Sequence, residues 1–196
     1  MSKSIGQQYD AIAAWWHEYH QDSNYGIAAL ERALNFSNAG GHALDVGCGA
    51  GGRFIRRLEA RNFQITGIDA SAKMIELAVQ NHPNGHFEQA DIIAWRSDES
   101  FDFILAWDCL FHLPLEQQAP VLAKLCGMLK QGGILLYSFG DAEGSHRDDW
   151  RGQTFHYSSI GVTKNLEILH KQGLELRHLE LDQFPEKHVF AIAKKS

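Results

Sequence analysis

From residue 43 onward, short apolar runs alternate with longer stretches in which apolar residues recur at helical spacing. The runs that we expect to form strands are "ALDV" (43–46), "FQITGID" (63–69), "GHFEQAD" (85–91), "FDFILAW" (101–107) and "GGILLYSF" (132–139). The expected helices are "GRFIRRLEARN" (52–62), "SAKMIELAVQNH" (71–82) and residues 114–130. This alternation, with short connections, predicts a mostly parallel sheet with helices on both faces.

The segments on either side of this region have different patterns. Residues 7–36 show helical spacing, and residues 159–172 are expected to form one further helix. The stretch "GDAEGSHRDDWRGQTFHYSS" (140–159) is polar, aromatic and rich in glycine, which is typical of a surface loop. Two strand-like runs within 173–194 are separated by only a few residues, so we expect them to pair as an antiparallel hairpin.

Size and charge restrict the class of protein. The 196 residues, 44% of them hydrophobic, suit a single globular domain. A net charge of −6 argues against non-specific nucleic-acid binding, which needs a basic surface. There is no apolar stretch long enough to span a membrane, and the N-terminal residues lack the apolar core of a signal peptide. The cysteines Cys48, Cys109 and Cys126 have no C-x-x-C spacing, so we expect reduced thiols in a cytoplasmic protein.

The stretch "HALDVGCGAGGRF" (42–54) indicates a ligand site at the end of the first strand. Gly47, Gly49 and Gly52 have the G-x-G-x-x-G spacing of dinucleotide-binding loops, which by itself is a weak signal. Asp69 ends the second strand, where a carboxylate can accept the hydroxyls of an adenosine ribose. That geometry serves NAD equally well, and Asp69 could instead cap the helix that begins near Ser71.

Three features favour a different adenine-bearing ligand over NAD. Asp45 lies inside the end of the first strand, and a buried carboxylate there needs a partner such as a cationic ligand. Asp91 ends the third strand, where it can accept a hydrogen bond from the adenine amine while Ile92 packs on the ring. The closing hairpin within 173–194 is absent from NAD-binding domains.

Taken together, five segments resemble those of class I S-adenosylmethionine-dependent methyltransferases. They are "LDVGCGAG", "GIDAS..M", "ADI", "FDFILAWDCLFHL" and "GGILLYSF", in this order over roughly residues 40–140. "AWDCLFHL", "FHYSS" and "PEKHVFAIAKK" also resemble a bacterial subgroup of small methyltransferases whose substrates are mostly unassigned.

The resemblance implies a three-layer α/β sandwich with a seven-stranded, mostly parallel sheet. Its strand order would be 3-2-1-4-5-7-6, with the last strand antiparallel and helices on both faces. Residues 1–196 would form one methyltransferase domain. Within it we expect an N-terminal helical lid (1–40), a cofactor-binding core (41–140) and a substrate-side loop, helix and hairpin (141–196). The cofactor would be S-adenosylmethionine, with S-adenosylhomocysteine as the product.

The resemblance also implies which residues contact the cofactor. Those expected around its methionine part are Asp45, Gly47, Cys48 and Gly49. Those expected around its adenosine are Asp69, Ala70, Met74, Asp91 and Ile92. The backbone of Ala106 and the side chain of Trp107 would lie near the sulfonium and the entrance for the substrate. The extra glycine, Gly52, departs from the common pattern, and Arg53 receives no role.

Candidate substrate-side residues come from three segments. Trp107, Asp108 and His112 follow the fourth strand, although a structural role for His112 as a helix cap is an equally good interpretation. His156 and Tyr157 belong to the expected loop after the fifth strand and could close over the site. Tyr9 and Trp16 would contact the ligand from the lid. The catalytic candidates are therefore His112, His156 and Asp108.

Other histidines receive structural interpretations. His17 and His20 have the one spacing that could suit a metal, but we expect them on the surface and predict no metal site. His146 is expected to be exposed, and His188 and Asp182 are expected to serve structure. The predicted function is methyl transfer to a small-molecule acceptor. The alternatives are a non-catalytic module that binds S-adenosylmethionine and, less favoured, an NAD-dependent oxidoreductase.

Overall fold

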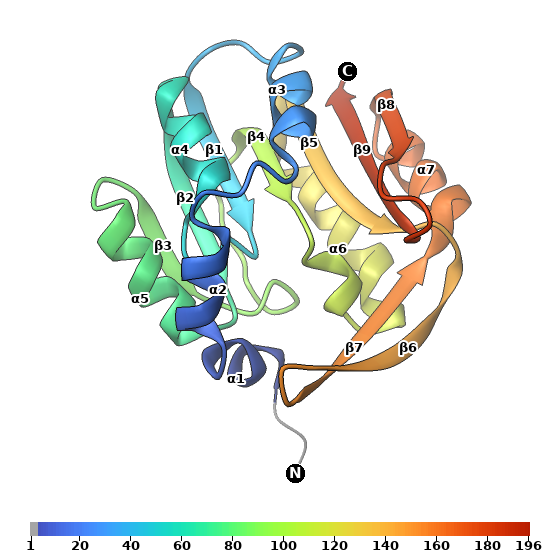
Figure 1. Ribbon diagram of the computed structural model, residues 1–196. Helices are drawn as coiled ribbons and strands as arrows, with labels where there is room; N and C mark the ends of the chain where they lie inside the picture. The colour runs from blue at the N-terminus through green and yellow to red at the C-terminus, as the bar shows by residue number, and fades with distance from the viewer. Residues whose placement is uncertain (1–3) are drawn as a thin grey trace.

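The computed structural model describes residues 4–196, so the first three residues of the predicted lid lie outside the described residues. Its centre is a seven-stranded sheet in the order β3-β2-β1-β4-β5-β9-β8 (Figure 1). The strands are β1 Gly41–Val46, β2 Phe63–Asp69, β3 His86–Gln89, β4 Phe101–Ala106, β5 Leu129–Gly140, β8 Leu174–Leu181 and β9 His188–Lys195. The first five run parallel to one another, and β9 is antiparallel to β5 and β8.

This is the predicted order 3-2-1-4-5-7-6. The last two strands of the sheet are labelled β9 and β8 because two further strands, outside this sheet, precede them in the sequence. Those two strands, β6 Glu143–Trp150 and β7 Gln153–Ile160, form a separate antiparallel hairpin. We predicted a surface loop over 140–159, and this prediction is wrong. β6 is exposed along nearly its whole length, so it carries no apolar alternation that would indicate a strand. Its backbone pairs with the half-buried β7 instead.

Helices cover both faces of the sheet because alternate residues of each strand point to opposite faces. Ala43 and Phe103 pack with α3 Ile27–Leu34 and α4 Arg53–Ala60, and α5 Ala72–Asn81 joins this layer through Ile75. Leu44 and Ile104 pack on the opposite side with α6 Leu115–Met128 and α7 Gly161–Lys171. The predicted three-layer sandwich is therefore confirmed.

The N-terminal segment forms two short helices before α3, namely α1 Ile5–Asp10 and α2 Ala13–His20. A capping box between Ser4 and Gln7 begins α1. The Gln8 side chain then donates to the backbone oxygen of Thr154 in β7, at 2.6 Å. Figure 1 shows α1 next to the turn of the β6–β7 hairpin, far from it in sequence. None of the helices in residues 4–196 has the length and apolar character needed to cross a membrane.

Candidate functional site

An open pocket with about 1270 Å³ of empty space lies at the carboxyl ends of β1, β2 and β4. The predicted site residues that line it are Tyr9, Trp16, Asp45, Gly47, Cys48, Gly49, Asp69, Ala70, Met74, Asp91, Ile92, Trp107, Asp108 and His112. Parallel strands place their carboxyl ends at one edge of the sheet, which brings together residues distant in sequence. Ala106, His156 and Tyr157 do not line this pocket.

The turn after β1 needs glycine at three places. Gly51 has φ 74°, and a Cβ atom there would lie 2.7 Å from Cδ2 of His82. Gly47 has φ 70°, and a Cβ atom there would lie 2.5 Å from Cβ of Cys109. Gly49 has φ 53°, and its N–H donates to Oδ2 of Asp69 at 2.9 Å. Gly52 differs, because a Cβ atom there would meet nothing within 4 Å. The backbone therefore requires glycine at positions 47, 49 and 51 but has room for a side chain at position 52.

Asp45, at the end of β1, carries a buried carboxyl group on the wall of the pocket. Burial and the charge of Asp69 raise the pKa of Asp45 to about 8, and Arg53 partly offsets them. Within residues 4–196, no donor forms a hydrogen bond with this carboxyl group. The group is thus mainly protonated at neutral pH and suited to a cationic partner from outside the protein.

Asp69 organises the next part of the pocket wall. Its Oδ1 accepts from the backbone N–H of Ser71 at 2.8 Å, while Oδ2 accepts from Gly49. Burial raises the pKa of Asp69, and these two N–H groups oppose the rise. The helix cap of α5 is provided by the hydroxyl of Ser71, which accepts from the N–H of Met74 at 3.1 Å. Asp69 therefore joins the glycine turn to the start of α5 rather than capping the helix itself.

The pocket continues past β3 to Asp91 and Ile92. Asp91 is exposed, and its Oδ1 accepts from the N–H of Ile93 at 2.9 Å. Ile92 is buried beside it, and Met74 is buried on α5. This end of the pocket offers a flat apolar space with a carboxylate at its rim.

Tyr9 and His112 form a polar pair between the lid and the segment after β4. The Tyr9 hydroxyl lies 2.9 Å from Nε2 of His112, and Nδ1 of His112 lies 3.0 Å from the backbone oxygen of His156. Because a carbonyl can only accept, Nδ1–H donates to it and Nε2 accepts from Tyr9. Burial lowers the pKa of His112 to about 4, so the ring is neutral. Burial also raises the pKa of the Tyr9 hydroxyl.

The lid carries two histidines on the pocket that we expected at the surface. His17 and His20 are partly buried and line the pocket, so that prediction is wrong. The ring of His20 stacks on Trp16 with centroids 4.0 Å apart, and its Nδ1 lies 2.9 Å from the Trp16 backbone oxygen. The helical spacing of the aromatic residues did predict that one face of this segment would be covered. It did not indicate that these histidines share that face.

Arg53 is a pocket residue that sequence reasoning missed. It begins α4, and its Nε–H donates to the backbone oxygen of Tyr25 at 2.5 Å. The guanidinium carbon lies 4.5 Å from the ring centre of Phe54. Its place directly after the glycine turn was a usable signal, since the first residue of that helix must lie beside the pocket.

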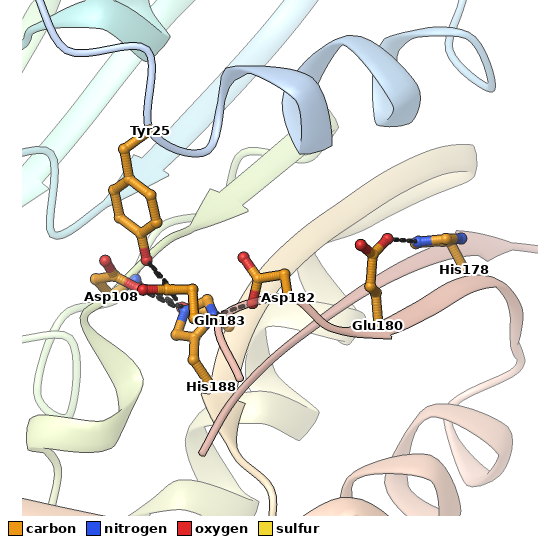
Figure 2. A network of polar contacts seen from close by, with 8 residues as sticks. Tyr25, Asp108, His178, Glu180, Asp182, Gln183 and His188 are labelled. Atoms are coloured by element: carbon orange, nitrogen blue, oxygen red, sulfur yellow. Dashed lines mark hydrogen bonds and ion pairs between the residues drawn. The ribbon is translucent and has the colours of Figure 1, made fainter. Parts of the chain in front are cut away.

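Asp108 follows β4 and joins the pocket wall to the closing hairpin. Figure 2 shows His188 between Asp108 and Asp182, with Tyr25 and Gln183 above it. Nε2 of His188 lies 2.9 Å from Oδ1 of Asp108, and its Nδ1 lies 2.5 Å from Oδ1 of Asp182. The adjoining Trp107 ring packs on His188, with centroids 5.4 Å apart. His188 thus connects to the pocket through Asp108, a link that nothing in the local sequence indicates.

The two candidate residues on β7 lie behind the pocket. His156 contributes its backbone oxygen to His112. The Tyr157 ring lies 4.9 Å from that of His112 and stacks on the exposed His146 at 5.2 Å. Across the described part of the chain, no group of three or more His, Cys, Asp or Glu residues could hold a metal ion.

Comparison with known proteins shows which proteins this chain is similar to. Residues 43–133 match the model of a methyltransferase domain. The chain is 36% identical over 110 residues to a trans-aconitate 2-methyltransferase of Methylobacterium radiotolerans, covering 54% of this chain and 41% of that protein. It is 33% identical over 141 residues to a ubiquinone biosynthesis O-methyltransferase of Coxiella burnetii, covering 66% of this chain and 58% of that protein.

The solved structures agree on the fold. An S-adenosylmethionine-dependent methyltransferase from Clostridium acetobutylicum aligns with a TM-score of 0.74 at 12% identity, covering 94% of this chain and 98% of that one. Over residues 43–133 the chain is similar to methyltransferase domains, and its fold is similar to that of S-adenosylmethionine-dependent methyltransferases. The chain spans about half the length of the curated relatives that it matches.

Proposed function

We propose that this protein binds S-adenosylmethionine in the β1–β2–β4 pocket and transfers its methyl group to a small-molecule acceptor. The observation that carries the proposal is the carboxyl group of Asp45, which is buried, lacks a donor among residues 4–196 and faces a pocket beside a glycine turn. An NAD site at this position needs no such acid. The methionine part of the cofactor, in contrast, carries an ammonium group for it.

The residues at the methionine end fit a zwitterion. Asp45 would hold the ammonium group, and the Arg53 guanidinium, which also lines the pocket, would hold the carboxylate. The backbone at Gly47, Cys48 and Gly49 would lie under the chain between them. This use of Arg53 adds a residue to the set predicted from the sequence.

The other end fits an adenosine. Asp69 would accept the ribose hydroxyls, in addition to the two N–H groups that already hold it in place. Ala70 and Met74 would lie near the adenine, Ile92 would pack on its ring, and Asp91 at the rim would accept from its amine. A carboxylate has about four lone-pair sites, so Asp69 can serve the glycine turn and the ribose together.

When bound, the cofactor supplies a methyl group on a sulfonium that is ready for in-line displacement. The protein aligns the acceptor with it, which can lower a barrier by roughly 7–11 kcal/mol. Tyr9 of α1 and Trp16 of α2 line the pocket, so the lid helices would shield the reacting atoms from water. His112 is neutral with both ring nitrogens engaged, so it positions Tyr9 in the lid rather than taking a proton from the acceptor.

The acceptor side would comprise Trp107 and Asp108 and extend to His17 and His20 of the lid, which line the same pocket. The pocket is lined by residues from the lid and from the ends of β1, β2 and β4, which supports binding of a cofactor and a small acceptor side by side. The two curated relatives are named for small organic acceptors, which supports this class. The free cysteines support a location in the reducing cytoplasm. The net charge of −6 supports an acceptor other than a nucleic acid.

Binding calorimetry and a methyl-transfer assay test the proposal. We expect S-adenosylhomocysteine to bind and NAD not to bind, and labelled methyl groups to reach at least one member of a panel of small acids, phenols and amines. Stabilisation by NAD alone would contradict the proposal. Binding without transfer to any acceptor would instead favour a non-catalytic sensor module.

Asp69 provides the site-directed test. Asp69→Asn keeps the shape of the side chain but removes the charge, and we expect it to weaken S-adenosylhomocysteine binding by about tenfold or more, as loss of one charge-assisted hydrogen bond does. Asp98→Asn, an exposed acid in the loop before β4, is the matched control. Unchanged affinity in Asp69→Asn would show that the ribose assignment is wrong.

A further inference from the structure

We infer that Asp108, positioned by His188, is the carboxylate through which the pocket distinguishes the sulfonium form of the cofactor from its neutral thioether product. The inference rests on the proposed function, since it concerns the same pocket. The two forms differ by one methyl group and one positive charge. A fixed negative charge facing the sulfonium would therefore favour the form that enters the reaction over the form that leaves it.

Asp108 is held in place by both its backbone and its side chain. Its N–H donates to Oγ of Ser138 at 2.8 Å, and that hydroxyl donates back to Oδ1 of Asp108 at 3.0 Å. Nε2–H of His188 donates to the same Oδ1 at 2.9 Å. The residue adopts φ 53°, a conformation that costs a side-chain-bearing residue free energy and persists only where its surroundings impose it.

His188 lies between two carboxylates, so both of its ring nitrogens donate and the ring is an imidazolium (Figure 2). Burial lowers the pKa of His188, but the hydrogen bonds and charges of Asp108 and Asp182 outweigh it and raise the pKa above its ordinary value. Gln183 donates to the Tyr25 hydroxyl at 2.6 Å, beside the same ring. This arrangement holds the Asp108 carboxylate in one position beside the His188 ring.

The charge of Asp108 acts on the pocket and not only on the hairpin. Asp108 lines the pocket, and the next residue, Cys109, packs directly against the glycine turn at Gly47. Its charge contributes to raising the pKa of the Tyr9 hydroxyl. It also raises the pKa of the Arg53 guanidinium, opposing the lowering that burial causes. The field of this carboxylate therefore reaches both the lid and the start of α4.

The other acids of the pocket are less suited to this task. Asp45 is mainly protonated before the cofactor binds, since its pKa is about 8. Asp69 is bonded to the glycine turn and α5. Asp91 lies beyond them at the end next to β3. Asp108 is the acid of this set that stands beside Trp107, where the resemblance to methyltransferases places the sulfonium.

Calorimetry with three probes tests the inference without any acceptor. The probes are S-adenosylmethionine, its amine analogue sinefungin, which is also cationic, and the neutral S-adenosylhomocysteine. In Asp108→Asn we expect affinity for the two cationic probes to fall about tenfold while affinity for S-adenosylhomocysteine changes less than twofold. His188→Gln should shift the same ratio in the opposite direction, because it removes the positive charge that partly offsets the charge of Asp108.

Glu180→Gln is the matched control, because Glu180 forms a carboxylate–histidine pair with His178 outside the pocket, at 2.7 Å. It should leave all three affinities unchanged. Equal losses for all probes, or none, in Asp108→Asn would overturn the inference. If Asp108→Asn does not fold, His188→Gln decides the question: a ratio that moves towards the cationic probes supports the inference, and an unchanged ratio overturns it. If no probe binds the unaltered protein, the proposed function itself fails.

Discussion

At the scale of single residues, some residues of the pocket could be predicted from the sequence and others could not. Asp45 and Asp69 were predictable because each ends an apolar run beside a glycine, so the nearest sequence neighbours define their positions. His20 could not be assigned in the same way, because its place in the pocket depends on how α2 lies over the ends of the strands. The partnership of Asp108 with His188 joins residues 80 positions apart.

The raised pKa of Asp45 predicts that binding of the cofactor releases a proton. At pH 7 its carboxyl group is mainly protonated because its pKa is about 8. An ammonium group beside it favours the ionised form and lowers this pKa, so binding of S-adenosylhomocysteine should release about one proton. Calorimetry at pH 7 in buffers of different ionisation enthalpy measures the release. We expect Asp45→Asn to abolish it, and an observed enthalpy that is independent of buffer in the unaltered protein would contradict the assignment.

At the scale of elements, the β6–β7 hairpin is the part that the sequence did not predict. Its turn places Arg151 and Gly152 at φ 50° and 73°, the left-handed pair typical of tight hairpins. Strand β6 is exposed and polar, so no buried face marks it as a strand. Its structure follows from pairing with β7, which is a long-range property of the backbone and not of the side-chain pattern.

The hairpin turn packs on the lid through aromatic rings. Trp150 lies 5.2 Å from Trp15 and 5.9 Å from Trp16, measured between ring centres, and the Arg151 guanidinium lies 3.3 Å from the ring centre of Trp15. Each aromatic pair contributes roughly 0.5–1.5 kcal/mol beyond the burial of its surface. The hairpin therefore holds α2 in the position where Trp16 and His20 line the pocket.

Trp150→Ala tests whether the hairpin holds the lid. We expect affinity for S-adenosylhomocysteine to fall by about tenfold, because the loss of two aromatic pairs frees α2 from the pocket. Cleavage of α2 by limited proteolysis should become faster at the same time. Thr154→Ala is the control, since it removes an exposed side-chain hydrogen bond to Asp149 in the same hairpin and keeps the backbone oxygen that accepts from Gln8 of the lid. Equal behaviour of the two variants would show that the hairpin does not position the lid.

At the scale of the whole molecule, the alternation of strands and helices was enough to predict the sheet, its two helical layers and the closing hairpin. These features depend on periodic burial, which the sequence records directly. The sequence did not reveal which side chains from α2, α4 and β9 meet around the pocket, because no period marks such contacts. The fold was thus more predictable than the acceptor side of its site.

The stability of the whole molecule should depend on pH through His112. Its pKa is about 4 in the folded protein and near 6.5 in the unfolded chain, so the unfolded state binds the proton more readily between these values. Stability is fully present above pH 6.5 and is lost as the pH falls towards 4. By pH 4.5 we expect the free energy of unfolding to fall by about 2–3 kcal/mol through this residue.

Urea unfolding at pH 7 and pH 4.5, followed by tryptophan fluorescence, measures this loss. His112→Gln, which cannot gain a proton, should lose less stability between the two pH values than the unaltered protein. His86→Gln, at an exposed position on β3, serves as the control and should retain the full loss. An identical pH dependence in all three proteins would show that His112 does not govern acid stability.

The position of β9 has a consequence for synthesis of the chain. β9 follows β8 in sequence but lies between β5 and β8, so β8 cannot join the sheet before β9 has been made, and until then β5 is paired on its β4 side only. About 55 residues separate the ends of β5 and β9, which corresponds to roughly 3–11 s at ordinary rates of translation. During that interval the apolar β5 presents an unpaired edge, the kind of surface that joins other chains. A newly made molecule therefore passes through a period in which chaperones and neighbouring chains compete for β5 before its own last strand arrives.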